Sequence, residues 1–298
     1  MRLKTILYSV FNVCIFALAA LMLTGCYKFD GDQTIPSYLK IDSVLLNTYY
    51  PDQGANSNAI KDVWVYVNDQ QIGAFELPAM FPVLAIGNQK LEIRPGIKVN
   101  GISSTRAPYP FYKPIIYSGF LFTPDSITNV VYPTTEYYPN INFLWMEDFE
   151  STGISLTESS SSDTSIVRTQ MSNNLDAESR YSGFISLTTE ARVYAASSSN
   201  SYPIPVQGSP TLLEVDFKTD NFINVGIIVQ ENSTFIKIPL VILNHSDVWN
   251  KIYVNLGPNL SLYPQATDFK VFFESVLEND LSSASIYLDN IKLINRPN

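Results

Sequence analysis

The chain has 298 residues, of which 46% are apolar and only 16% are charged, and its formal net charge is −9. The apolar content excludes an intrinsically disordered chain. The acidic balance argues against a nucleic-acid binder, which needs a basic face. Two Cys and one His offer neither a disulfide framework nor a thiolate zinc site.

The N-terminus has the pattern of a secretory signal. Arg2 and Lys4 form a short basic region, and an apolar run follows as far as Leu23. A single membrane-spanning anchor is the alternative interpretation, because the run approaches the roughly 20 residues that a spanning helix needs. The residues at the end of the run decide between the two interpretations.

Those residues, Leu23-Thr24-Gly25-Cys26, resemble the lipobox of bacterial lipoproteins. The resemblance implies that residues 1–25 are a cleaved signal peptide and that Cys26 carries acyl chains such as palmitate. Cleavage removes Cys14 and two cations but no acid, so the net charge of the mature chain is −11 instead of −9. Cys26 would then be its only cysteine, held by a lipid anchor.

Residues 26–35 are interpreted as a lipidated tether. The stretch 27–32, YKFDGD, is acidic and resembles the export signal of surface-exposed lipoproteins in Bacteroidota-type outer membranes. A solvated spacer is the plainer interpretation. The resemblance implies an outer-membrane lipoprotein that faces the cell exterior.

Residues 36–131 are predicted to form a small β-sandwich. The run 62–67, DVWVYV, is rich in β-branched and aromatic residues, and Asn68-Asp69 leads into a second run over 71–77, which predicts a hairpin. The stretch 63–97, with Ile72-Gly73 and Pro95-Gly96 at its turns, resembles a PEGA-like β module. Such modules bind partners or act as spacers.

Residues 132–140, YPTTEYYPN, have poor periodicity and predict a linker. Aromatic residues gather on both sides of this boundary. They could fill the seam between the domains or form an exposed patch for a partner. The candidate partner residues are Tyr109, Phe111, Tyr112, Tyr137 and Tyr138.

Residues 141–298 are predicted to form a jelly-roll β-sandwich. Turn residues separate eight strand-like runs, at 182–188, 192–196, 211–218, 222–230, 234–243, 248–256, 268–276 and 284–294. Three pieces, at 147–150, 249–256 and 285–293, resemble the first, a late and the closing strand of carbohydrate-binding and MAM-like jelly rolls. The fold class expected for the whole chain is therefore all-β, a small N-terminal β-sandwich followed by a jelly roll.

The resemblance suggests two kinds of site. In such modules a structural calcium joins the first and last strands, and the matching positions here are Glu147, Glu150 and Asp289. Aromatic platforms would bind glycan, and the candidates are Tyr194, Tyr202 and Trp249. The plainer alternatives are surface carboxylates at strand ends and, for Trp249, packing in the core.

The sequence contains no recognisable catalytic motif, and the chain is predicted not to be an enzyme. His245 is followed by Ser246 and Asp247, but neighbours in sequence do not make a catalytic triad, and the pattern indicates an exposed loop. Carboxylate pairs are the only acid–base candidates for a cell-surface hydrolase, which is the third hypothesis.

The leading functional hypothesis is a non-catalytic interaction subunit of an outer-membrane protein complex for secretion, gliding or outer-membrane protein assembly. Its partners would be an outer-membrane barrel or other lipoproteins. The alternative is a surface glycan-binding lipoprotein of a polysaccharide-uptake system.

Overall fold

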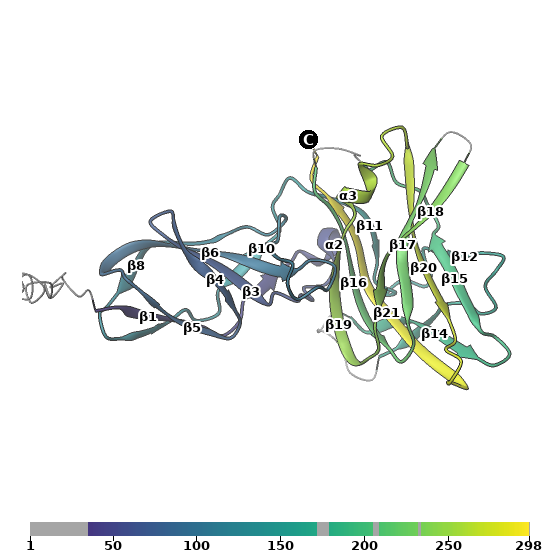
Figure 1. Ribbon diagram of the computed structural model, residues 1–298, viewed down its shortest axis with the longest axis horizontal. Coiled ribbons are helices and arrows are strands. Elements are labelled where there is room, and N and C mark those ends of the chain that lie inside the picture. The colour runs from purple at the N-terminus through teal and green to yellow at the C-terminus, as the bar shows by residue number, and fades with distance from the viewer. Residues whose placement is uncertain (1–34, 172–178, 205–208, 232–233, 298) are drawn as a thin grey trace, which may run out of the picture. The chain divides into compact units, whose positions relative to one another are not determined.

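The computed structural model describes residues 35–171, 179–204, 209–231 and 234–297 (Figure 1). Backbone contacts divide the chain into Met1–Pro36 and a compact unit, Ser37–Asn298. The predicted signal, Cys26 and most of the tether lie outside the described residues. Among the residues that are described, no helix has the length and hydropathy of a membrane span.

The strands β1–β10 form what we call the first lobe. Its sheets have the orders β5-β1-β9, β10-β2 and β4-β3-β6-β7, with β8 on β6. The bounds are β1 Ser37–Ile41, β2 Leu45–Asn47, α2 Tyr50–Gln53, β3 Asp62–Val67, β4 Gln70–Glu76, β5 Ala79–Val83, β6 Gly87–Lys98, β7 Arg106–Pro108, β8 Ile115–Phe122, β9 Ile127–Asn129 and β10 Thr134–Glu136.

The expected hairpin is present, and its turn explains its register. Asn68 and Asp69 both have positive φ, 49° and 66°. These angles suit the tight turn whose twist matches two antiparallel strands, and Asn and Asp adopt them at low cost. β3 and β4 consequently pair from Val67 and Gln70 at the turn outward.

The strands β11–β21 form the second lobe, a sandwich of two antiparallel sheets. One has the order β13-β14-β21-β16-β19, with β11 also on β21, and the other has the order β12-β15-β20-β17-β18. The bounds are β11 Asn142–Glu147, β12 Leu156–Glu158, β13 Val167–Gln170, β14 Tyr181–Thr188, β15 Val193–Ser198, β16 Thr211–Thr219, β17 Ile223–Glu231, β18 Thr234–Leu243, β19 Ser246–Asn255, α3 Gly257–Leu260, β20 Asp268–Val276 and β21 Ser283–Asn295.

The all-β fold class is confirmed, and each of the eight strand runs expected in the second lobe corresponds to one strand, β14 to β21. The first strand of this lobe also pairs with the closing one, since Glu147 lies opposite Ile291. The segment 132–140 is not free of structure, because it contains β10, whose Thr135 pairs in parallel with Leu46 of β2.

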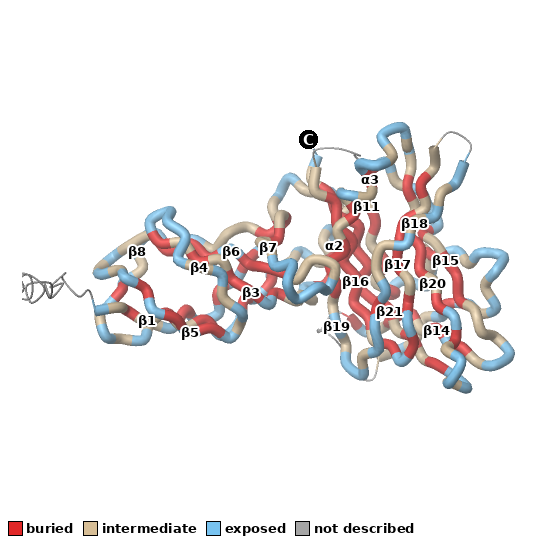
Figure 2. Tube along the Cα trace, viewed as in Figure 1, coloured by how far each residue is buried: buried red, intermediate tan, exposed pale blue. Residues whose placement is uncertain are grey.

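Each lobe has its own hydrophobic core, seen as buried stretches in Figure 2. The core of the second lobe lies between its two sheets, and Val215 and Val254 are among its fully buried members. The core of the first lobe is completed by Leu212, Tyr253 and Ile294, which belong to strands of the second lobe. The two lobes are therefore joined by packed apolar contacts as well as by the chain.

Candidate functional site

The outer face of the six-stranded sheet carries the polar and aromatic groups that could bind a ligand. Side chains alternate between the two faces of a strand. Val215 of β16 points into the core, so Glu214 and Asp216 stand on the outer face. In β19, Val254 is in the core, and Lys251 stands on the outer face.

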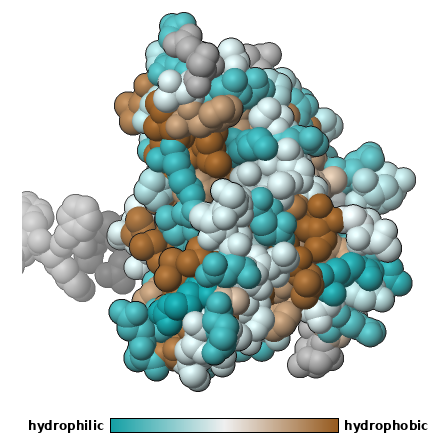
Figure 3. Space-filling model, turned by 90° about the vertical axis from the view of Figure 1, so that its right-hand side faces the viewer, coloured by the Kyte–Doolittle hydropathy of each residue, from teal (hydrophilic) through white to brown (hydrophobic). Residues whose placement is uncertain are grey.

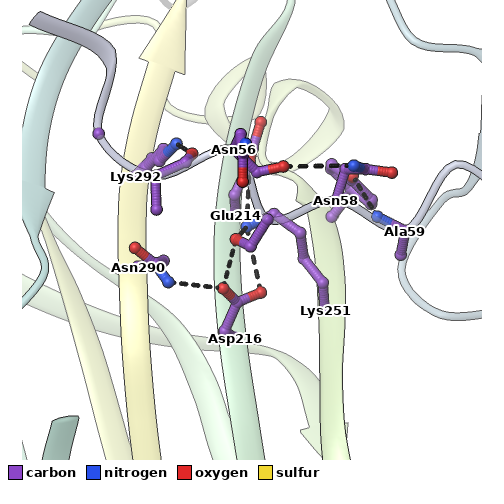
Figure 4. Close-up of polar contacts among 12 residues, drawn as sticks. Asn56, Asn58, Ala59, Glu214, Asp216, Lys251, Asn290 and Lys292 are labelled. Atoms are coloured by element: carbon purple, nitrogen blue, oxygen red, sulfur yellow. Dashed lines mark hydrogen bonds and ion pairs between the residues drawn. The ribbon is translucent and has the colours of Figure 1, made fainter. Parts of the chain in front are cut away.

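One part of this face is covered by the first lobe, and a buried charge cluster lies there. Lys251 Nζ is 3.1 Å from Asp216 Oδ1 and 3.4 Å from Glu214 Oε2, and it donates a hydrogen bond of 3.0 Å to Ser57 Oγ of the first lobe. Figure 4 shows Lys251 beside both carboxylates. Burial alone would lower the pKa of Lys251, but Asp216 and Glu214 outweigh it and raise that pKa.

A second buried cation of this sheet face, Lys292, also contacts the first lobe. Lys292 Nζ of β21 donates to the backbone oxygen of Ala55 at 2.6 Å, and the Tyr253 hydroxyl of β19 accepts from the backbone N–H of Ala59 at 3.0 Å. We call residues 55–59 of the first lobe the covering segment. Its polar contacts fill the space that a ligand would need on this part of the sheet.

The tyrosines expected as a partner surface lie in this contact between the lobes. The hydroxyls of Tyr109 and Tyr137 donate to Glu214 Oε1 at 2.5 Å and 3.0 Å, and burial followed by the charge of Glu214 raises the pKa of Tyr109. Tyr109, Phe111, Tyr112 and Tyr137 are at most 3% exposed. These four fill the seam and form no partner surface. Tyr138 remains half-buried beside Arg296.

The other part of the outer face is not covered by any described residue of the first lobe, and it contains a hollow of about 190 Å³. Its described lining combines two aromatic rings with polar side chains and one cation. These residues are Thr169, Gln170, Met171, Ser182, Lys218, Trp249 and Tyr287. We call it the Trp249 hollow.

Aromatic rings from three strands form a row at this hollow. Trp249 of β19 and Tyr287 of β21 have ring centroids 6.3 Å apart, and Phe184 of β14 follows at 5.0 Å from Tyr287. All three side chains are half-buried, so each ring keeps some surface exposed. Lys218 lies opposite Tyr287 in the strand pairing, with its Nζ 5.9 Å from the ring centroid.

Of the three residues expected to bind glycan, the structure places only Trp249 in this hollow. Tyr194 is 0% exposed and points into the core of the second lobe, where it offers no ring to a ligand. Tyr202 is half-buried and stacks on Trp145, with ring centroids 6.1 Å apart. The three residues do not form one platform.

The carboxylates expected to bind calcium are engaged elsewhere. Glu147 Oε2 accepts from Ser155 Oγ at 2.6 Å, and Glu150 Oε1 accepts from the Tyr181 backbone N–H at 2.8 Å. Asp289 is fully buried, and its Oδ1 accepts from the Asn290 backbone N–H at 2.7 Å. Within the part of the chain that the structure describes, no group of three acidic, His or Cys side chains could hold a metal ion. The structure does not assemble the expected site.

His245 lies exposed between β18 and β19, as expected. Its Nε2 is 2.6 Å from Glu278 Oε1, and Ser246 Oγ donates instead to the backbone oxygen of Val248 at 2.7 Å. The neighbouring serine is therefore not hydrogen-bonded to the imidazole.

No protein-family model matches the chain, and no curated protein matches it. Solved structures with similar folds are distant. A carbohydrate-binding module of the β-sandwich superfamily is 13% identical, with a TM-score of 0.35 over 78% of this chain and 84% of that one. The family 11 carbohydrate-binding module from Clostridium thermocellum is 16% identical, with a TM-score of 0.33 over 50% and 93%.

The enzymatically active domain of bacteriophage CBA120 tailspike protein 4 is 13% identical, with a TM-score of 0.39 over 49% of this chain. The chain spans about a fifth of the length of that tailspike chain. Resemblances at this level carry no argument about what this protein binds, so its function has to be argued from its own residues.

Proposed function

We propose that the protein is a non-catalytic glycan-binding protein and that the Trp249 hollow is its binding site. The observation that supports this most directly is the row of the half-buried side chains Trp249, Tyr287 and Phe184 across one sheet face. Sugar rings have apolar faces that pack against aromatic rings, and large aromatic side chains supply much contact area at fixed geometry.

The polar lining suits the same ligand class. Ligand sites combine apolar walls with a few polar groups that fix orientation. Here Lys218, Gln170 and Thr169 border the aromatic rings and can donate hydrogen bonds to sugar hydroxyls. The hollow is smaller than the roughly 300 Å³ at the lower end of drug-sized pockets. It would hold a single sugar ring, with the rest of a chain along the aromatic row.

The covering segment limits the length of the site. It occupies the part of the same sheet face that carries Asp216 and Lys251, so a glycan could extend only away from the first lobe. The proposed ligand is therefore a chain end or a short stretch, and a long chain laid across the whole sheet would collide with the first lobe.

We further propose that the protein acts at the outer membrane, anchored by lipid on Cys26 and facing the exterior. The support is the order of basic residues, apolar run and lipobox-like LTGC in the sequence. This location would present the Trp249 hollow to extracellular polysaccharide.

A glycan array followed by titration calorimetry tests the binding site. We expect Trp249→Ala and Tyr287→Ala to lower the affinity for the best glycan at least tenfold, about 1.4 kcal/mol. Phe235→Ala is the matched control, since Phe235 is 67% exposed on β18 of the other sheet. Unchanged affinity in both hollow variants, or an equal loss in the control, would contradict the proposal.

A further inference from the structure

One end of the first lobe carries several large apolar side chains that are exposed and take no part in the hydrophobic core. Leu84, Ile86, Leu121 and Ile127 are each 54–72% exposed. Isolated exposed aliphatic residues are ordinary on protein surfaces, but a group of them at one place marks a contact with another apolar surface.

The strand pairing brings these residues to one end of the lobe. Ser37, the first residue of β1, pairs with Val83, next to Leu84. Ser37 Oγ also donates to the backbone oxygen of Ala85 at 3.0 Å, which holds the β5–β6 connection against the start of β1.

The two remaining members belong to the same end. Ile127 begins β9 and lies opposite Tyr38 of β1. Leu121 lies opposite Asn88, close to the last residues of β8 and the first of β6. The end is therefore the one from which β1 starts in Figure 1, and we call it the β1 end.

The connections 84–86 and 123–126 contain a single charged residue, Asp125. Two charged residues near these connections, Lys90 and Asp69 beside the start of β6, are joined in a salt bridge of 2.5 Å. The face of the molecule that Figure 3 shows also carries apolar side chains, but there they lie in several groups that are separated by polar side chains.

We propose that the β1 end rests on the membrane that holds the lipid anchor and inserts its aliphatic side chains among the lipids. This inference rests on the proposed anchoring at Cys26. Ser37, the first residue of β1, lies eleven positions after Cys26, and an extended chain spans at most about 3.6 Å per residue. The start of β1 then cannot stand more than about 40 Å from the acylated residue.

The composition of the β1 end favours lipid over a protein partner. Protein interfaces are enriched in Tyr, Trp, Met and Arg, whereas the large exposed apolar residues of the β1 end are Ile and Leu. Because multiple acyl chains already give stable anchoring, the contact would serve to orient the molecule. We therefore expect the contact to fix how deeply the β1 end inserts into the membrane. The affinity of the whole lipidated protein for the membrane should hardly change.

The chain allows a direct test of orientation. Its two cysteines are Cys14, in the predicted signal, and Cys26, whose thiol would be acylated, so an introduced cysteine can be labelled alone. The lipidated protein, labelled with a fluorophore at Leu121→Cys, is placed in phosphatidylethanolamine–phosphatidylglycerol vesicles that contain nitroxide-labelled lipid. The matched control is Leu262→Cys, at a position 70% exposed in the second lobe.

We expect lipid quenching at position 121 to exceed that at position 262 at least threefold. Leu84→Asn with Ile86→Asn should remove the excess, whereas Val248→Asn, at a position 66% exposed in the second lobe, should not. Equal quenching at both positions in protein that floats with the vesicles would overturn the membrane contact alone. Failure to float would overturn the anchoring as well.

The same label also distinguishes a protein occupant. If the label at position 121 is shielded from a water-soluble quencher in native outer membranes but exposed in pure lipid vesicles, a protein covers the β1 end and the proposal is wrong. Shielding of equal degree in both preparations supports it.

Discussion

Lys251 of the second lobe lies 3.1 Å from Asp216, and both side chains are at most 3% exposed. The same ammonium group binds Ser57 of the first lobe. A buried ion pair needs close geometry and further hydrogen bonds to offset the loss of hydration. Here Glu214 and Ser57 supply them, so the charge cluster joins the two lobes and depends on both.

We expect Lys251→Met to destabilise the protein by about 3–5 kcal/mol, because it leaves two buried carboxylates without their cation. The measurement is urea unfolding followed by fluorescence. Lys218→Met is the matched control, since Lys218 is a half-exposed lysine on the same face of β16, and it should change stability by less than about 1 kcal/mol. Equal effects of the two changes would contradict the role given to the cluster.

The tyrosines in the seam between the lobes should contribute unequally to the free energy of unfolding. The hydroxyl of Tyr109 donates to the Glu214 carboxylate at 2.5 Å, whereas the hydroxyls of Tyr112 and Tyr253 are 3.4 Å apart. Hydrogen bonds to charged groups contribute about 1.5–3 kcal/mol, and those between neutral groups about 1 kcal/mol. Unfolding measurements should therefore show a larger loss for Tyr109→Phe than for Tyr112→Phe, and the reverse order would refute this.

The strands of the second lobe could be predicted from the sequence because core residues alternate with outward-facing residues along them. Ile252 and Val254 point inward, which already places Trp249 on the opposite face by parity. The interpretation of Trp249 as a core residue overlooked this signal. Tyr287 and Phe184 carry the same signal on strands that were predicted correctly.

The sequence could not show which part of the outer face is covered. Glu214 and Asp216 alternate with core residues in the way that solvent-exposed residues do, yet they are at most 2% exposed. Their burial depends on the covering segment, which lies more than 150 positions earlier in the chain. Docking of the lobes through such distant contacts leaves no local pattern, and for the same reason the sequence could not decide whether Tyr109 and Tyr137 fill the seam or form an exposed patch.

Asp62 should make stability depend on pH. It is 0% exposed, and Arg106 Nη1 lies 3.1 Å from its Oδ1. Burial raises the pKa of Asp62 more than Arg106 lowers it. The folded state therefore binds the proton more tightly than the unfolded state, and stability declines as the pH rises from the ordinary range of Asp through the raised pKa.

We expect Asp62→Asn to remove that decline and to stabilise the protein at pH 7, since no buried carboxylate then has to ionise. Arg106 keeps Glu76 as its partner, at 2.6 Å. Unfolding curves between pH 4 and pH 8 would measure this, with Asp42→Asn, at a largely exposed carboxylate, as the control. A variant that is less stable than the wild type at pH 7 would show that the pairing with Arg106 outweighs burial.

Tyr194 offers a test that separates core from site. Its hydroxyl is buried and has no hydrogen-bond partner among the described residues. Tyr194→Phe should therefore stabilise the protein by about 1 kcal/mol, because it removes an unsatisfied polar group. Glycan affinity should not change, since the ring is in the core. A loss of affinity in a variant of unchanged stability would show that Tyr194 takes part in binding.

Phe184 should matter only for longer glycans. It is the third ring of the row, 5.0 Å from Tyr287, and it is not among the residues that line the Trp249 hollow. A single sugar held between Trp249 and Tyr287 would not reach Phe184, whereas a second or third sugar would pack on it.

Contacts of one aromatic ring contribute about 0.5–1.5 kcal/mol. Calorimetry with oligosaccharides of increasing length should therefore show that Phe184→Ala lowers affinity up to about tenfold for trisaccharides and leaves monosaccharide binding unchanged. An equal loss at every length would mean that the row does not set the direction in which the glycan extends.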